Sequence, residues 1–137
     1  MGKTALDMLF HRIPKVEVPV GLGAYDLVLF IAPVWMGQVA SPLRGCFRKL
    51  GQEIRAFAFA SISGGADGQN PRLAAELRKS LGREPAAVVD LHIADLLPRE
   101  PKPERKDTSA YKVTEGDVEH LTGKVLAALA EAGFGKE

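Results

Sequence analysis

The chain has 137 residues, the length of one domain, and its formal net charge of +1 gives no sign of a nucleic-acid-binding or membrane-binding surface. Hydrophobic residues make up 46% of the sequence and charged residues 26%, as is ordinary for a soluble globular protein. The single cysteine, Cys46, excludes an internal disulfide and fits a reducing cytoplasm, and we expect it to be a small packed apolar residue. No apolar stretch reaches the ~18 residues that a membrane span needs. We therefore expect a cytoplasmic protein with neither a membrane nor a nucleic-acid partner.

The N-terminal part is predicted to hold one short helix and one short strand. Residues 3–12 should be helical, because apolar side chains recur there at spacings of three and four. Pro14 should end that helix. Residues 15–18 alternate between charged and apolar side chains, which indicates a brief strand.

The most informative stretch runs from Tyr25 to Pro42 and reads YDLVLFIAPVWMGQVASP. Its continuous apolar run, residues 27–32, is rich in β-formers and too short for a typical helix. It therefore predicts a strand buried on both faces, as in a parallel sheet covered by helices. Pro33 cannot donate a hydrogen bond to a neighbouring strand, so the strand should end there.

A loop and a helix are predicted to follow this strand. The loop carries an aromatic residue, Trp35, and a flexible Gly37. The helix should run to Leu50, with Ser41 as its N-cap and Pro42 in its first position. A buried strand, such a loop and a capped helix form the place where open α/β sheets bind ligands.

The second half of the chain is predicted to continue this alternation. Residues 55–61 should form a second buried strand, and residues 62–70 a glycine-rich loop. A helix with Asn70 as its N-cap should end at Gly82. Residues 86–93 should form a third strand, so three strong strands alternate with helices.

The C-terminal part is predicted to be a surface excursion followed by a long helix. Residues 97–110 are rich in proline and charge, which is typical of a surface loop. Residues 114–132 should be helical, with Thr114 and Asp117 resembling a capping box with a shorter acid. Its predicted buried stripe is Val118, Leu121, Val125, Leu126 and Leu129. The whole pattern predicts one α/β domain, residues 1–137, with a parallel sheet between helical layers.

Two stretches of this pattern resemble the flavodoxin-like family, particularly its short-chain members. Residues 25–26, Tyr-Asp, precede the central strand, and residues 33–37, PVWMG, follow it, as around the family's third strand. Residues 63–65, SGG, resemble the family's second flavin-contacting loop. The resemblance implies a three-layer open parallel sheet with helices on both faces, of which four strands are recognisable here.

The resemblance also implies FMN as the cofactor. In this family the flavin ring needs an aromatic or apolar wall, and glycines let backbone groups approach its polar edge. The phosphate needs backbone N–H groups at a helix N-terminus. The residues that match these needs are Gly2, Lys3, Thr4, Pro33, Val34, Trp35, Met36, Gly37, Ser63, Gly64, Gly65 and Asp67.

The sequence departs from the family at its beginning. Residues 2–4, Gly-Lys-Thr, match the end of a phosphate loop, but the first strand and most of that loop are missing before them. Three explanations stay open. Either the chain is truncated relative to its relatives, or the sheet is rearranged to four strands, or another chain fills the gap in the sheet. Because charge-assisted hydrogen bonds to the phosphate contribute roughly 1.5–3 kcal/mol each, we expect weak FMN binding or none.

Plainer interpretations stand beside these. Trp35 is either a wall for the flavin or a loop aromatic packed on a neighbour, and residues 64–68 are either a ligand loop or a simple turn. Tyr111 either borders the crevice or anchors the excursion, and we favour the anchor. Residues 2–4 also match the tail of a Walker A loop, which lacks its earlier glycine here. The three histidines have no metal-ligand spacing, so we expect no metal site, and no catalytic residue can be named.

Two functions follow from this pattern. The first is an FMN-dependent redox protein, either an electron carrier or an NAD(P)H-dependent oxidoreductase, with NAD(P)H or a redox protein as its partner. The balanced charge weakly disfavours a dedicated electron carrier. The second is a flavodoxin-like interaction or assembly module without cofactor. A gap in the sheet and apolar helix faces would favour a homodimer.

Overall fold

The structure is a computed structural model that describes residues 21–35, 38–39 and 41–135. The predicted helix 3–12 and the predicted strand 15–18 lie outside the described residues. A short 3-10 helix, η1 (Leu22–Ala24), precedes the first described strand.

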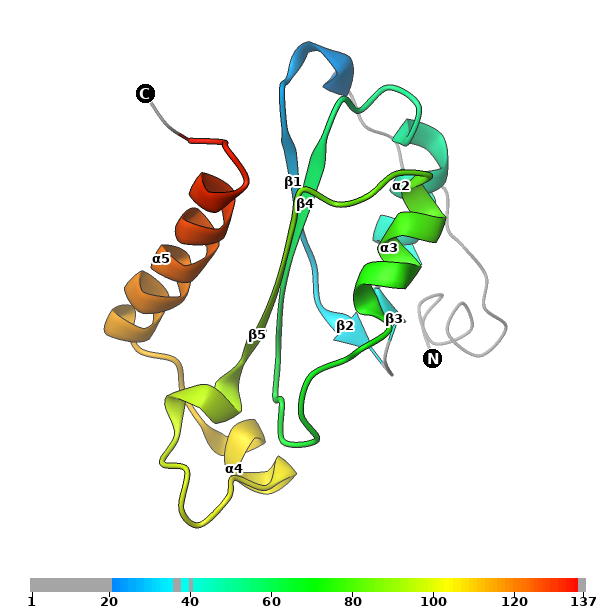
Figure 1. Ribbon diagram of the computed structural model, residues 1–137. Coiled ribbons are helices and arrows are strands. Elements are labelled where there is room, and N and C mark those ends of the chain that lie inside the picture. The colour runs from blue at the N-terminus through cyan, green and yellow to red at the C-terminus, as the bar shows by residue number, and fades with distance from the viewer. Residues whose placement is uncertain (1–20, 36–37, 40, 136–137) are drawn as a thin grey trace.

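A three-stranded parallel sheet lies at the centre of the molecule (Figure 1). β4 (Phe57–Ser63) is the middle strand, and β1 (Val28–Ile31) and β5 (Ala87–His92) pair with its two edges. All three are strands that the sequence predicts. Because they are parallel, their carboxyl ends lie at the same edge of the sheet.

Helices cover both faces of this sheet, as the resemblance implies. α2 (Ser41–Leu50) and α3 (Leu73–Leu81) lie on one face, and α5 (Glu115–Glu131) lies on the other, packed against β5 (Figure 1). The observed bounds of α2 are the predicted ones. No helix in the described part of the chain is long and apolar enough to cross a membrane.

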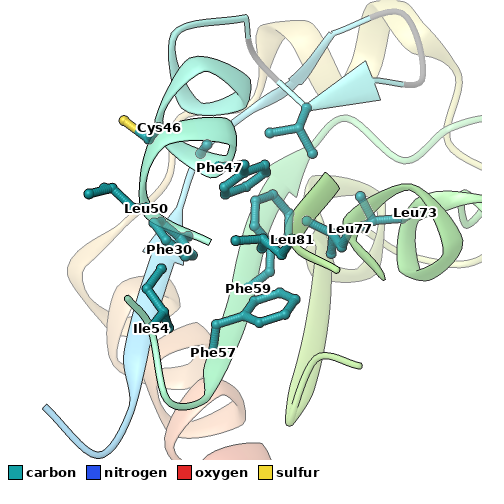
Figure 2. Packing of buried hydrophobic residues seen from close by; sticks show 12 residues of the cluster. Phe30, Cys46, Phe47, Leu50, Ile54, Phe57, Phe59, Leu73, Leu77 and Leu81 are labelled. Carbon is teal, nitrogen blue, oxygen red and sulfur yellow. The ribbon is translucent and has the colours of Figure 1, made fainter. Parts of the chain in front are cut away.

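The main core lies between the sheet and the α2–α3 layer. Phe30 of β1, Phe57 and Phe59 of β4, Phe47 of α2 and Leu77 of α3 belong to one buried cluster (Figure 2). The rings of Phe30 and Phe47 meet edge to face, with centroids 5.0 Å apart. Burying one such side chain contributes roughly 1.5–3 kcal/mol, so this cluster holds both helices on the sheet.

Cys46 is buried in α2, which confirms the prediction of a packed apolar residue. Burial raises the pKa of its thiol, mainly because the thiolate would lose its hydration. A thiol that stays protonated is a poor nucleophile, so Cys46 is a packing residue.

The face of the sheet opposite the core is less covered than predicted. Phe30 is buried, but Ile31 points to the other face of β1 and is 72% exposed, so β1 is not buried on both faces. On that face α5 packs against β5, at the far edge of the sheet from β1. The predicted buried stripe of α5 is wrong for Val118 and Leu126, which are exposed, because one strand covers only part of the width of the helix.

The segment after β1 contains a small hairpin where the sequence predicts only a loop. β2 (Val34–Trp35) and β3 (Gln38–Val39) pair antiparallel, with Val34 beside Val39. Strands of two residues are too short to leave a pattern in the sequence. Burial of Val39 in the main core holds them in place.

The start of α3 differs from the prediction. The helix begins at Leu73 with Arg72 as its N-cap, rather than after Asn70. The Asn70 side-chain oxygen instead accepts the Arg72 N–H at 3.1 Å, which closes a turn just before the helix.

The excursion after β5 is more ordered than a surface loop. A 3-10 helix, η2 (Ile93–Leu96), precedes residues 97–110, and these residues contain a helix, α4 (Arg105–Ala110). A capping box starts α4, with the Glu104 N–H donating to Asp107 Oδ2 at 2.9 Å. Because Thr108 of α4 is buried, this segment packs on the domain and does not merely cross its surface.

One carboxylate, that of Asp117, joins the excursion to α5. It accepts the Thr114 N–H and the Tyr111 hydroxyl, each at 2.8 Å, and the Asp117 N–H donates to Thr114 Oγ1 at 3.2 Å. This confirms the predicted capping box and the interpretation of Tyr111 as an anchor. The hydrogen bonds from Thr114 and then Tyr111 lower the pKa of Asp117.

We expect Asp117→Asn to lower the free energy of unfolding at pH 7, with a difference from wild type that shrinks at acid pH. Because the pKa of Asp117 is lowered on folding, its stabilisation is fully present above its ordinary value of about 3.9 and is lost as pH falls through the folded pKa. Urea unfolding between pH 7 and pH 2 measures this. A pH-independent difference between Asp117→Asn and wild type would contradict the assignment.

Candidate ligand site at the carboxyl edge of the sheet

A hollow of about 640 Å³ opens at the edge of the sheet where the strands end. The hairpin, the loop after β4 and α4 all lie at this end of the molecule (Figure 1). The hollow is lined by Val34, residues 63–71, Arg105, Thr108 and Ser109. Its size falls within the roughly 300–1,000 Å³ of sites for small molecules and cofactors.

The hairpin forms one wall of this hollow. β1 ends at Ile31, Pro33 lies between it and the hairpin, and Val34 starts the hairpin and contributes to the lining. Two contacts fix it: Val39 packs in the core, and its N–H donates to Glu76 Oε1 of α3 at 3.2 Å. The hairpin is thus attached to α3 as well as to the sheet.

The opposite wall is the glycine-rich loop after β4. Gly65 has a φ of +73°, and its carbonyl accepts the Gly68 N–H at 3.0 Å, so the chain turns tightly there. The Gly64 carbonyl accepts the Ala94 N–H of η2 at 2.9 Å. A methyl group on Gly64 would lie 2.9 Å from Thr108 Oγ1, so this loop and α4 touch closely.

An ion pair joins the glycine loop to α4 at the rim of the hollow. Arg105 donates to Asp67 Oδ2 from Nε at 3.0 Å and from a terminal nitrogen at 2.7 Å. These are the two charged residues of the lining. Both side chains are largely exposed, so the pair contributes little to stability and opens at small cost. The site therefore has one cation at its rim that an anionic ligand can recruit.

A buried polar cluster lies behind the glycine loop. The Ser61 hydroxyl donates to Asp90 Oδ1 at 3.0 Å, and His92 Nε2 lies 3.1 Å from Asp90 Oδ2. Ser61 and Asp90 are neighbours in the β4–β5 register, and His92 follows on the same face of β5. The serine contacts the aspartate rather than the histidine, so the cluster is not a nucleophilic triad.

The structure brings five of the predicted site residues into the lining of one hollow: Val34, Ser63, Gly64, Gly65 and Asp67. Trp35 belongs to the adjoining hairpin and Pro33 precedes it. The other candidates, Gly2, Lys3, Thr4, Met36 and Gly37, lie outside the described residues. That these residues bind a cofactor stays a prediction.

Sequence reasoning missed the contribution of α4 and of β5. Arg105 and Thr108 were placed in a surface loop, although Glu104 and Asp107 three residues apart could have indicated a capped helix. Asp90 and His92 alternate along a strand and so share a face, but nothing in the sequence pairs them with Ser61. Among the described residues, no three side chains of His, Cys, Asp or Glu gather as metal ligands.

The fold and the site define an open α/β domain with a ligand hollow beyond the carboxyl ends of its strands. The fold is similar to that of a flavoprotein from Lactobacillus acidophilus NCFM, whose crystal structure was determined in complex with FMN. The similarity has a TM-score of 0.52 at 22% sequence identity and covers 63% of this chain. The chain spans 59% of the length of that flavoprotein. No family model and no curated protein matches the chain. The similarity shows a flavodoxin-like fold.

We expect Gly65→Ala to destabilise the protein more than Gly68→Ala. Both glycines have positive φ, +73° and +90°, and alanine there is strained by about 1–2 kcal/mol. A methyl group on Gly65 would also lie 2.3 Å from His92 Cβ, whereas one on Gly68 would meet nothing within 4 Å. Urea unfolding of the two variants measures the difference, which is the cost of the close contact between a methyl group on Gly65 and His92. Equal destabilisation of the two variants would show that Gly65 is not in close contact with His92.

Proposed function

We propose that this protein is an FMN-binding flavoprotein that acts in electron transfer or in NAD(P)H-dependent reduction. The observation that carries the proposal is the meeting of the PVWMG and SGG segments at one hollow, through Val34 and residues 63–65. The similarity of the fold to a flavoprotein crystallised with FMN supports it. Bound FMN would supply the redox chemistry, because its ring accepts either single electrons or a hydride.

We propose that the ring half of FMN occupies this hollow. Val34 and Trp35 would supply the apolar and aromatic wall, and the backbone of residues 63–68 would approach the polar edge of the ring. The volume of about 640 Å³ leaves room for a flat aromatic ligand. Arg105 at the rim would contribute positive charge once it leaves Asp67.

The phosphate half of FMN is assigned to Gly2, Lys3 and Thr4, which lie outside the described residues. Only these three residues of the sequence match a phosphate loop, so we expect the phosphate to add little affinity. Riboflavin, which lacks the phosphate, separates the two halves of the site. FMN and riboflavin should bind with affinities within about tenfold of each other, equivalent to 1.4 kcal/mol.

Titration of the purified chain with FMN should quench flavin fluorescence, and Trp35→Ala should weaken binding by about tenfold, since aromatic stacking contributes ~0.5–1.5 kcal/mol beyond the area it buries. Trp35→Phe should retain most of the affinity. Tyr25→Ala is the matched control, because Tyr25 is an exposed aromatic beyond the opposite end of β1. Unchanged fluorescence at micromolar wild-type protein would reject FMN binding.

A second candidate function, a homodimeric assembly module without cofactor, is favoured by the exposed apolar residues on the α5 side of the molecule. Ile31 is 72% exposed, Leu126 60% and Val118 53%. β1 lies at an edge of the described sheet, and its sequence, VLFI, has no charge or proline to discourage pairing with another strand. A second copy of this chain is the partner we propose for this edge.

If β1 forms a dimer contact, Ile31→Lys should convert the dimer to a monomer, because a charge would be buried in an apolar interface. Size-exclusion chromatography with light scattering measures the mass. Val113→Lys places the same charge on an exposed apolar residue between α4 and α5 and should leave the mass unchanged. A monomeric wild type would exclude this candidate, and a yellow purified protein would favour the flavoprotein.

A further inference from the structure

The carboxylate of Asp90 is the centre of the buried cluster behind the hollow. Its Oδ1 accepts a hydrogen bond from Ser61 Oγ at 3.0 Å, and His92 Nε2 lies 3.1 Å from its Oδ2. The side chains of His92 and Asp90 are 6% and 16% exposed. A partly buried carboxylate between the buried Ser61 and His92 is held in place, because turning it would leave Ser61 unsatisfied.

The same pair of β5 residues contacts the glycine loop at both of its ends. At the start of the loop, the Cα of Gly65 lies so close to His92 that a methyl group would be 2.3 Å from His92 Cβ and 2.4 Å from Cγ. At the end of the loop, the Asn70 N–H donates to Asp90 Oδ2 at 3.5 Å, a long hydrogen bond. The segment between these two points, residues 65–70, lines the hollow.

We propose that Asp90 and His92 are positioning residues that fix the glycine loop in the shape in which it receives the ligand. The His92 side chain packs against Gly65 near the start of the loop. The Asp90 carboxylate lies beside the His92 ring and accepts the Asn70 N–H at the end of the loop. This inference rests on the proposed function for the identity of the ligand, FMN. The anchoring itself is a property of the free protein and can be measured without FMN.

Asp90→Asn is the informative substitution. The asparagine amide has the shape of the carboxylate, and its one oxygen can still accept from Ser61. Its nitrogen cannot accept a hydrogen bond, and the amide carries no charge. Asparagine therefore has one oxygen for the two donors, Ser61 and Asn70, and loses the attraction of a carboxylate for the His92 ring. Ser61→Ala is the matched control, because it removes one donor to the same carboxylate and no contact to the loop.

Hydrogen–deuterium exchange of the free chain, read on peptides covering residues 64–70, tests the anchoring. We expect exchange there to rise by about tenfold in Asp90→Asn, the scale of losing a hydrogen bond to a charged group, and to stay near wild type in Ser61→Ala. Exchange in α2 and β4 should not change in either variant. The Kd for FMN should rise by a similar factor in Asp90→Asn alone.

His92→Gln and His92→Ala repeat the test if Asp90→Asn does not fold. Glutamine keeps an N–H donor at a reach similar to Nε2 and should preserve slow exchange in residues 64–70, whereas alanine should lose it. Unchanged exchange in the loop, or an equal rise throughout the chain, would overturn the anchoring. Failure of the wild type to bind FMN overturns the proposed function instead, and the exchange experiment then decides the anchoring separately.

Discussion

The parallel pairing of β4 with both β1 and β5 is the constraint on which the candidate site depends. It places the carboxyl ends of three strands at one edge, so the segments that follow them must meet there. The hairpin after β1, the glycine loop after β4 and the excursion after β5 all border the same end of the sheet (Figure 1). An antiparallel β1 would have carried the hairpin to the opposite end of the molecule, and no shared hollow would exist.

The two faces of the sheet differ in how completely helices cover them. Phenylalanines of β1 and β4 pack in one buried cluster with Phe47 of α2 and the leucines of α3 (Figure 2). On the opposite face α5 covers β5, and Ile31 of β1 remains exposed. Ile31 of β1 and the exposed Val118 and Leu126 of α5 do not line the hollow.

Much of the fold could be predicted from the sequence because its signals are local. The apolar run before Pro33 and the Thr114–Asp117 cap each depend on neighbouring residues, and both were placed correctly. The hairpin was missed because two-residue strands have no periodicity. The Ser61–Asp90–His92 cluster was missed because it is made by strand register, which joins residues 29 positions apart. The part of the candidate site that could be predicted is therefore the five lining residues in the two recognisable loops, namely Val34, Ser63, Gly64, Gly65 and Asp67.

Gly64 and Gly65 have a consequence for how this site could vary. Gly64 contacts Thr108 of α4, and Gly65 contacts His92 of β5, so each glycine packs against a different element. A side chain at Gly64 would have to shift the Thr108 hydroxyl, and one at Gly65 would have to shift His92. A methyl group on Gly68, which also lines the hollow, would meet nothing within 4 Å. Within this loop, space for a different side chain therefore lies at the tip, and the base is fixed by packing.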